Sequence, residues 1–283
     1  MTLRKKMIAK PAEADPALAD LQSHADHRRL PIARVGIKRL FYPFRVLDRQ
    51  RKFQDVTGEF EVYVDLTHEE RATHMSRFVE IINHHRGEVT SNTIESILKD
   101  VKKRLQARRA ELAVNFPYFV EKHAPVSREA SFMRYDCRFW AALDRKLDFI
   151  LTVTVPVTTL CPCSKAISKA SAHNQRSMVT VAVRFRRMVW IEEVISLVEA
   201  SASAEVYSLL KRADEKELTE RAYDRPRFAE DLVREVAIRL DSHPEITWFT
   251  VETENLESIH AHSAFAFLKK DKRRSRAFRT AGA

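Results

Sequence analysis

The stretch Leu160–Arg176, LCPCSKAISKASAHNQR, decides how this chain folds and what it can hold. It contains Cys161 and Cys163, two of the three cysteines in the sequence, followed by His173. Alternating apolar residues on both sides predict a β-strand before it and another after it. Thiolate and imidazole groups are ligands that zinc and related metals prefer. A segment that presents both between two strands therefore indicates a metal site.

The composition favours a globular protein of a reducing compartment. Of the 283 residues, 45% are hydrophobic, and no apolar run approaches the roughly 20 residues that a membrane helix needs. The basic N-terminus lacks the apolar segment of a signal peptide. Three cysteines cannot build a disulfide framework, which favours the cytoplasm. Four glycines leave no Gly-rich phosphate loop, which argues against P-loop and Rossmann chemistry.

The formal net charge of +10 has one obvious source in the C-terminal run Lys269–Arg279, KKDKRRSRAFR. A solvated chain end is the ordinary interpretation of such a run. Binding to nucleic acid is a second interpretation. A third is that lysines and arginines elsewhere in the chain neutralise a small polyanionic substrate.

The hydrophobic pattern gives the same order of elements twice: strand, strand, helix, helix, strand, strand. In the first half we expect strands at 34–48, 60–66, 112–118 and 133–139, a helix from the Thr67/Glu70 capping box to Gly87, and a helix at 94–105. In the second half we expect strands at 147–157, 179–185, 246–254 and 264–268, a helix from Ile191 that can continue to Leu209, and a helix at 228–240.

This order predicts an α+β fold, with antiparallel sheet and the helices on one face. The predicted segments are a flexible N-terminal arm (1–30), a first unit (31–143), a second unit with the metal site (144–268) and a basic tail (269–283). The connection between the last two strands can lie at the same end of the sheet as the segment around Cys161, which brings further donors near it.

A site built mainly from cysteine is excluded, so carboxylates or histidines must complete it, and such mixed sets are typical of catalytic metals. The best further donors are Glu215, Glu257, His260 and His262. Ordinary alternatives exist for several of them. Glu215 can be a surface charge in a turn that ends a helix, and His260 and His262 can be a solvated pair on one strand face. A further carboxylate, Glu230, can be a first-turn residue favoured by the helix dipole. A rival chemistry uses Cys163 as a nucleophile, with His173 or His260 as its base.

Several motifs occur together and in the order found in one family: Leu160–Lys165 (LCPCSK), Ala172–Arg176 (AHNQR), Lys211–Lys216 (KRADEK), Arg227–Asp231 (RFAED), and Glu257–His260 (ESIH) with His262. In these motifs the chain resembles the type IB GTP cyclohydrolases, the alternative family of GTP cyclohydrolase I. The resemblance extends from about residue 20 to 268 and is highly specific. Ser171 departs from it, because the family pattern has glycine there.

The resemblance implies the tunnelling fold, with two units in tandem, and a homotetramer with active sites between subunits. It implies a divalent metal ion (zinc, manganese or ferrous iron) and conversion of GTP and water to 7,8-dihydroneopterin triphosphate and formate, the first step toward tetrahydrofolate. The alternatives are an archaeal relative that forms a cyclic-phosphate pterin and, in another class, a nucleic-acid-binding protein that uses the tail. Nucleic acid is the less favoured partner, and no membrane is expected.

The resemblance also implies roles for single residues. It assigns the metal site to Cys161, His173, Glu215 and His260, with His260 as either ligand or proton carrier. Glu230 matches the residue that anchors guanine, Cys163 and Glu257 match positions near the reaction centre, and His262 is placed with the substrate. Lys165 and Arg176 are candidates for the triphosphate because of their charge and proximity.

Overall fold

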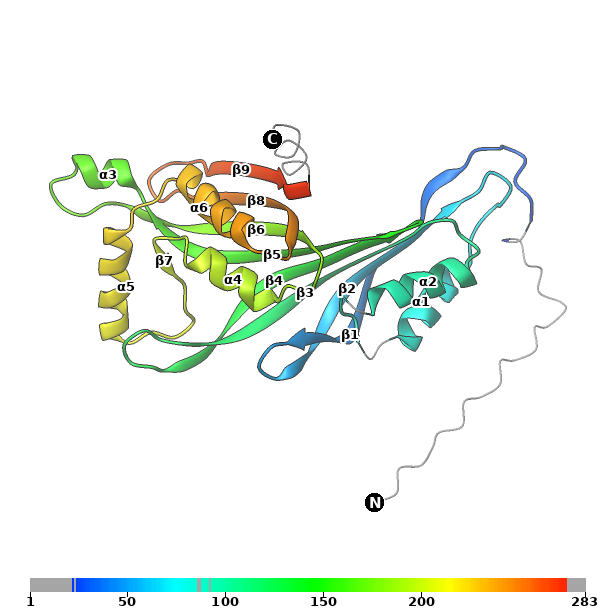
Figure 1. Ribbon diagram of the computed structural model, residues 1–283, viewed down its shortest axis with the longest axis horizontal. Coiled ribbons are helices and arrows are strands. Elements are labelled where there is room, and N and C mark those ends of the chain that lie inside the picture. The colour runs from blue at the N-terminus through cyan, green and yellow to red at the C-terminus, as the bar shows by residue number, and fades with distance from the viewer. Residues whose placement is uncertain (1–21, 23, 86–87, 92, 274–283) are drawn as a thin grey trace, which may run out of the picture.

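The computed structural model describes residues 22, 24–85, 88–91 and 93–273 (Figure 1). The strands within these residues are β1 (Ile32–Asp48), β2 (Lys52–Leu66), β3 (Ala110–His123), β4 (Ala130–Leu143), β5 (Leu147–Leu160), β6 (Asn174–Phe185), β7 (Ala204–Glu205), β8 (Ile246–Leu256) and β9 (Ala264–Asp271). The helices are α1 (Met75–His84), α2 (Ile94–Arg104), α3 (Pro162–Ile167), α4 (Ile191–Glu199), α5 (Arg212–Asp224) and α6 (Ala229–Ser242). Each strand predicted from the sequence is present, with longer bounds than the prediction gave.

The described strands form one antiparallel sheet in the order β1-β2-β3-β4-β5-β6-β8-β9, and β7 pairs with β5. The first half (β1–β4 with α1 and α2) joins the second half (β5–β9 with α3–α6) where β4 pairs with β5. Leu143 lies opposite Leu147 there, and Asp136 lies opposite Thr154. The fold class predicted from the sequence is confirmed, with the two halves sharing one continuous sheet.

One face of the sheet is apolar and packs against the helices. On β2, Phe60, Val62 and Val64 point to this face and are at most 3% exposed. Side chains of α1, α2, α4 and α6 join those of the strands in a single buried cluster. Figure 1 shows α1 and α2 beside β1 and β2, and α4 and α6 beside the strands of the second half. The opposite face carries polar residues such as Glu59 and Arg134, as expected for an antiparallel sheet with one solvated side.

Buried charges connect the long β3–β4 pair to α4 of the second half. Lys122 Nζ lies 2.7 Å from Glu199 Oε1, and the two side chains are only 10% and 14% exposed. The hydroxyl of Tyr135 also donates to Glu199 Oε1, at 2.8 Å. The hydroxyl of Tyr118 donates to Glu192 at 2.6 Å. Burial and these carboxylates raise the pKa of both tyrosines well above the usual value, so each phenol stays protonated as the donor.

The first helix begins later than predicted. The Thr67 amide and hydroxyl donate to Glu70 Oε2, at 3.1 and 2.9 Å, so the predicted pairing of these residues exists. It stabilises a turn and not a helix, because α1 begins at Met75. Glu70 also pairs with Ala25 in an isolated β-bridge. This pairing requires an extended backbone at Glu70, so the helix begins only after it.

The prediction of a helix from Ile191 to Leu209 is wrong in its second part, because α4 ends at Glu199. The chain then lies against β5, where Ser203 N–H donates to Thr158 O at 3.1 Å and Leu160 N–H donates to Ser203 Oγ at 3.2 Å. Ser203 is fully buried, and small neighbours let the backbone approach the sheet closely. Backbone pairing with β5 therefore replaces the helix.

Glu215 lies in the first turn of α5 and not in a turn that ends a helix. The sequence did not predict α5, because this helix buries few apolar side chains, among them Leu218 and Ala222, and so lacks an apolar stripe. At the C-terminus, β9 continues to Asp271, so Lys269 and Lys270 pair with β8 instead of belonging to a free tail.

Three expectations fall partly or wholly outside the described residues: the N-terminal arm, the helix end at Gly87 and the basic tail beyond Arg273. Among the helices that the structure does describe, none combines the length and the apolar character needed to cross a membrane.

Candidate active site

Cys161, His173 and Glu257 lie at one end of the sheet, just beyond the ends of the neighbouring strands β5, β6 and β8. Leu160 at the end of β5 pairs with Asn174 at the start of β6, and Leu256 at the end of β8 pairs with Arg176. The buried positions of these strands have odd numbers, for example Val157, Val179 and Val251. Cys161, His173 and Glu257 continue that odd-numbered spacing just beyond their strands.

Cys161 is held by α3 and by the backbone of His173. It is the N-cap of α3, with Pro162 in the first turn, and its Sγ accepts from Ser164 N–H at 3.4 Å. Proline is favoured at this position, since its missing N–H would have no partner in the helix. The Cys161 amide donates to His173 O at 3.1 Å. The two candidate ligands are therefore fixed side by side, while Cys163 is exposed on α3.

His173 makes close polar contacts through Nδ1. Gln175 Oε1 lies 3.1 Å from this nitrogen, and Glu257 Oε2 lies 3.8 Å from it. The His173 and Glu257 side chains are 13% and 12% exposed. Ser171, two residues earlier, has φ of 66°, in the left-handed region that glycine adopts without a steric penalty. The departure from the glycine of the family pattern therefore falls at a position whose backbone conformation favours glycine.

His260 and His262 lie in the connection between β8 and β9, at this same end of the sheet. Their rings stack, with centroids 5.2 Å apart and planes 27° apart, and both residues are exposed. The prediction that this connection lies at the same end of the sheet as the Cys161 segment is consistent with the strand register.

Arg176 and Glu215 line one hollow, together with Asn174, Thr158 and Tyr207. Arg176 points to solvent from β6 and Glu215 from α5, and both are exposed. The hollow is thus a concave surface next to the Cys161 edge, with an arginine and a carboxylate on its walls.

Lys165 and Glu230 have different surroundings. The Lys165 ammonium donates to Tyr223 O at 2.5 Å and lies 4.1 Å from the centre of the Tyr223 ring. Lys165 is thus engaged with α5 and is not a freely solvated loop charge. Glu230 is exposed in the first turn of α6, where the helix dipole favours a carboxylate. The roles assigned to both residues stay predictions.

Asp214 fixes the helix that carries Glu215. Its side chain is fully buried and accepts from the amides of Val126, Ser127 and Lys211, each at 2.8 Å, and from the Ser127 hydroxyl at 2.6 Å. Val126 and Ser127 belong to the β3–β4 turn of the first half. Burial alone raises the pKa of Asp214, but these hydrogen bonds outweigh it and hold the pKa well below its usual value. Asp214 thus ties α5 to the first half of the chain.

We expect Asp214→Asn to lower the unfolding temperature at neutral pH, because the amide replaces an acceptor of several N–H and O–H donors. A depressed pKa in the folded state adds stability above the unfolded pKa, near 3.8, and this stability is lost as the pH falls below it. The difference in unfolding temperature between parent and variant should therefore shrink as the pH falls from about 5 toward 3. Calorimetry across this range measures it, and a difference that grows on acidification would contradict the assignment.

The sequence did not single out the residues that hold His173 in place. Gln175, Thr159 and Ser177 occupy buried positions of β5 and β6, and hydrogen bonds join them. Their signal was available, because polar residues continued the odd-numbered apolar series of both strands. Polar side chains at inward positions of a strand need hydrogen-bond partners. Here these side chains bond to one another, and the last of them, Gln175, contacts His173.

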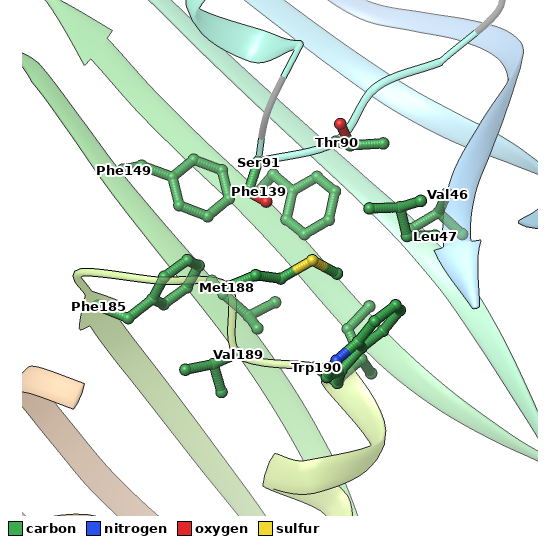
Figure 2. A pocket seen from close by; sticks show the side chains of 12 residues that line it. Val46, Leu47, Thr90, Ser91, Phe139, Phe149, Phe185, Met188, Val189 and Trp190 are labelled. Atoms are coloured by element: carbon green, nitrogen blue, oxygen red, sulfur yellow. The ribbon is translucent and has the colours of Figure 1, made fainter. Parts of the chain in front are cut away.

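The pocket in Figure 2 lies elsewhere, where the two halves meet. Aromatic side chains surround Met188 there, namely Phe139, Phe149, Phe185 and Trp190. The lining also includes the hydroxyl groups of Thr90 and Ser91. None of the residues expected to carry the chemistry lines it. Its apolar wall does not suit a triphosphate.

The donors fit a divalent metal in their chemistry, and partly in their placement. A backbone hydrogen bond joins Cys161 to His173, and the Glu257 carboxylate lies 3.8 Å from His173 Nδ1, so the three residues lie at the same end of the sheet. Within the described part of the chain, no group of three or more His, Cys, Asp or Glu side chains is close enough to hold a metal ion. Within these residues, Glu215 and His260 are not gathered around Cys161 and His173.

The family model of type I GTP cyclohydrolase folE2 matches residues 18–266. GTP cyclohydrolase FolE2 of Geobacter sulfurreducens is 52% identical over 258 residues, which cover 91% of this chain and 100% of that protein. The chain belongs to this family. GTP cyclohydrolase FolE2 of Citrifermentans bemidjiense is 51% identical over 257 residues, 91% of this chain and 96% of the relative. FolE2 is the type IB enzyme, so the resemblance seen in the motifs is confirmed.

Solved structures similar to this FolE2 family member share its fold at low identity. Urate oxidase from Bacillus sp. TB-90 superposes with a TM-score of 0.54 at 9% identity, over 85% of this chain and 100% of that one. A uricase from Bacillus fastidious gives 0.53 at 7% identity, over 88% and 96% of the two chains. The tunnelling fold expected for the family is thereby confirmed.

Proposed function

We propose that this chain is a metal-dependent GTP cyclohydrolase I, which converts GTP and water to 7,8-dihydroneopterin triphosphate and formate, the first step toward tetrahydrofolate. Membership of the FolE2 family supports the reaction. The observation that carries the proposal is the convergence of Cys161, His173 and Glu257 at one sheet edge, beside a hollow lined by Arg176 and Glu215. The names of the relatives do not favour the cyclic-phosphate product.

In this proposal Cys161 and His173 hold the metal, and Glu215 and His260 complete the site. A bound divalent ion lowers the pKa of water, so that hydroxide is available at neutral pH. Thiolate, imidazole and carboxylate together accept zinc, manganese or ferrous iron. The adjacent backbone positions of Cys161 and His173 support the first two assignments.

The chain's own acid and base groups would carry the protons. Hydration at C8 opens the imidazole ring of guanine, and a second hydration releases formate. Ribose opening, rearrangement and ring closure follow, and closure returns one water. Glu257, with Oε2 close to His173, and the solvated His260 and Cys163 are the proposed proton carriers. His262, stacked on His260, is proposed to contact the substrate.

Glu230 is the proposed anchor of guanine, because a carboxylate accepts hydrogen bonds from both N1–H and the 2-amino group. Arg176 and Lys165 are the proposed triphosphate ligands. Arg176 already faces the hollow, whereas Lys165 would have to leave Tyr223 O to reach a phosphate.

The active sites are proposed to lie between subunits of a cytoplasmic homotetramer. Two features support an interface near the site. The described residues of one chain do not gather a complete metal site, and the edge strand β9 exposes Phe265 and Phe267 by 61% and 53%. Large exposed apolar side chains on an edge strand are typical of a surface that another chain covers.

An assay of the purified full-length chain with GTP tests the function. The protein is treated with a chelator and then given zinc, manganese or ferrous iron, and formate and oxidised neopterin are measured. Metal-dependent formation of both products is expected. A folded protein that binds GTP and forms neither product with any of these metals would refute the proposal.

Removing the residues after Arg273 should leave GTP turnover unchanged. The family match ends at residue 266, and β9 ends at Asp271. A cut after Leu268 would be less clean, because it removes the Lys269–Asp271 part of β9 and Lys272, whose ammonium donates to His243 O at 2.8 Å. Loss of turnover in the Arg273 truncation, with no change in the unfolding temperature, would give the tail a role. Loss of nucleic-acid binding with intact turnover would support the second class of function.

A further inference from the structure

We propose that Gln175 is a positioning residue that fixes the ring orientation and the tautomer of His173. It does so as the member next to His173 in a series of hydrogen bonds that runs from Ser177 through Thr159 and Gln175 to His173. The final consequence, that His173 Nε2 is presented as a metal ligand, rests on the proposed function.

The side chains that form this series of hydrogen bonds are fixed in place because they are buried. Gln175 is 7% exposed, and Thr159 and Ser177 are fully buried. The Gln175 amide donates to Thr159 Oγ1 at 3.0 Å, and the hydroxyls of Thr159 and Ser177 lie 2.8 Å apart. A buried polar group that loses its partner is costly, so the amide of Gln175 is anchored from the β5 side and cannot rotate freely.

The direction of the hydrogen bonds follows from the groups around His173 Nδ1. Gln175 Oε1 lies 3.1 Å and Glu257 Oε2 3.8 Å from this nitrogen, and a carbonyl oxygen and a carboxylate can only accept. With Gln175 in this orientation, Nδ1 carries the proton and donates it to Gln175 Oε1. In the reversed arrangement the Gln175 amide nitrogen would donate to the Nδ1 lone pair, and this electron-rich nitrogen would lie 3.8 Å from the Glu257 carboxylate with no proton between them. Glu257 thus favours the arrangement in which Nδ1 donates and Gln175 Oε1 accepts.

In the neutral ring, a proton on Nδ1 leaves the lone pair on Nε2, the nitrogen that takes no part in these hydrogen bonds. Metal-binding histidines commonly donate their other N–H to such an acceptor, and loss of the acceptor typically lowers metal affinity by about 10–100-fold. Here the acceptor is a neutral amide. A residue that only filled space or satisfied Thr159 would have no such effect on His173.

The first test measures zinc affinity of the full-length chain by competition with a chromogenic chelator. Gln175→Leu removes the acceptor and should weaken zinc binding by about 10–100-fold. Gln175→Glu keeps an acceptor at Nδ1, with Thr159 now donating, and should stay close to the parent. Thr253→Val is the control, since it removes a fully buried hydroxyl on β8 that bonds Asn255 and does not contact His173. It should leave zinc affinity unchanged.

The second test reads the tautomer directly, by nitrogen NMR of the full-length, metal-free chain with labelled histidine. The His173 signals, identified by their loss in His173→Asn, should show a protonated Nδ1 in the parent and in Gln175→Glu. Gln175→Leu should lose this preference. A parent protonated on Nε2 would overturn the proposal, and so would a Gln175→Leu variant with the parent's tautomer and zinc affinity.

The two tests separate failure of this inference from failure of the proposed function. If Cys161→Ala binds zinc as tightly as the parent, the metal assignment is wrong. The tautomer measurement uses no metal, and it then decides alone whether Gln175 positions His173.

Discussion

Replacing Cys161 or His173 with alanine lowers kcat/KM for GTP by roughly 1000-fold or more, because metal stabilisation contributes several kcal/mol. Each variant should also lose tightly bound metal while keeping the fold. The Cys161 side chain is half-buried and accepts a hydrogen bond from Ser164 N–H, and His173 lies just before β6 and outside the apolar core. Activity, metal content and the unfolding temperature are the measurements.

His123→Ala is a suitable control for the histidine variant, since His123 is exposed at the end of β3 and belongs to no part of the proposed site. It should retain parent activity and metal content. Full activity in Cys161→Ala or His173→Ala would remove that residue from the metal site. Loss of activity with a large fall in unfolding temperature would point to a structural defect, and metal content would then decide.

Replacing Glu230 with glutamine raises the Kd for GTP by roughly 10–100-fold, since a hydrogen bond to a charged group contributes about 1.5–3 kcal/mol. One acceptor of the proposed guanine pair becomes a donor. The fold should be unaffected, because Glu230 is exposed in the first turn of α6. Equilibrium binding of GTP and of inosine triphosphate, which lacks the 2-amino group, measures the effect.

The ratio of the two affinities makes this prediction specific. The parent should prefer GTP, and the preference should narrow in Glu230→Gln. Glu235→Gln, on the same helix, is the matched control and should keep both affinities. Equal affinities of parent and Glu230→Gln for GTP would leave Glu230 as a carboxylate that only stabilises the start of α6.

The strands could be predicted because their side chains alternate between a buried and a solvated face. Val153, Val155 and Val157 on β5 are fully buried, and this strict alternation fixed the strand and its face. Its extension beyond the apolar run was missed because polar residues continue it, at Thr159 on β5 and at Gln175 and Ser177 on β6. Those polar residues proved to be the buried hydrogen-bond chain.

The helices were harder to predict where tertiary contacts replace an apolar stripe. After α4 the backbone of Ser203 pairs with Thr158 on β5 instead of continuing the helix. No local feature of the sequence predicts this pairing. The start of α5 depends on Asp214, whose donors Val126 and Ser127 are remote in sequence. In the candidate site, the motifs supplied the expected residues, and the strand register shows which of them lie near one another. Glu215 and His260 remain apart from Cys161 and His173 within the described part of one chain.

The β3–β4 pair has a consequence for recombination between relatives. The turn of this hairpin supplies the donors of Asp214, and Lys122 on β3 pairs with Glu199 on α4. A crossover near residue 143 looks natural from the repeated order of elements, yet it separates each buried carboxylate from its partner. A chimera assembled there would fold well only if both parents carry matching residues at these positions. The exchangeable unit is therefore the whole chain, or a segment that includes both sides of each pair.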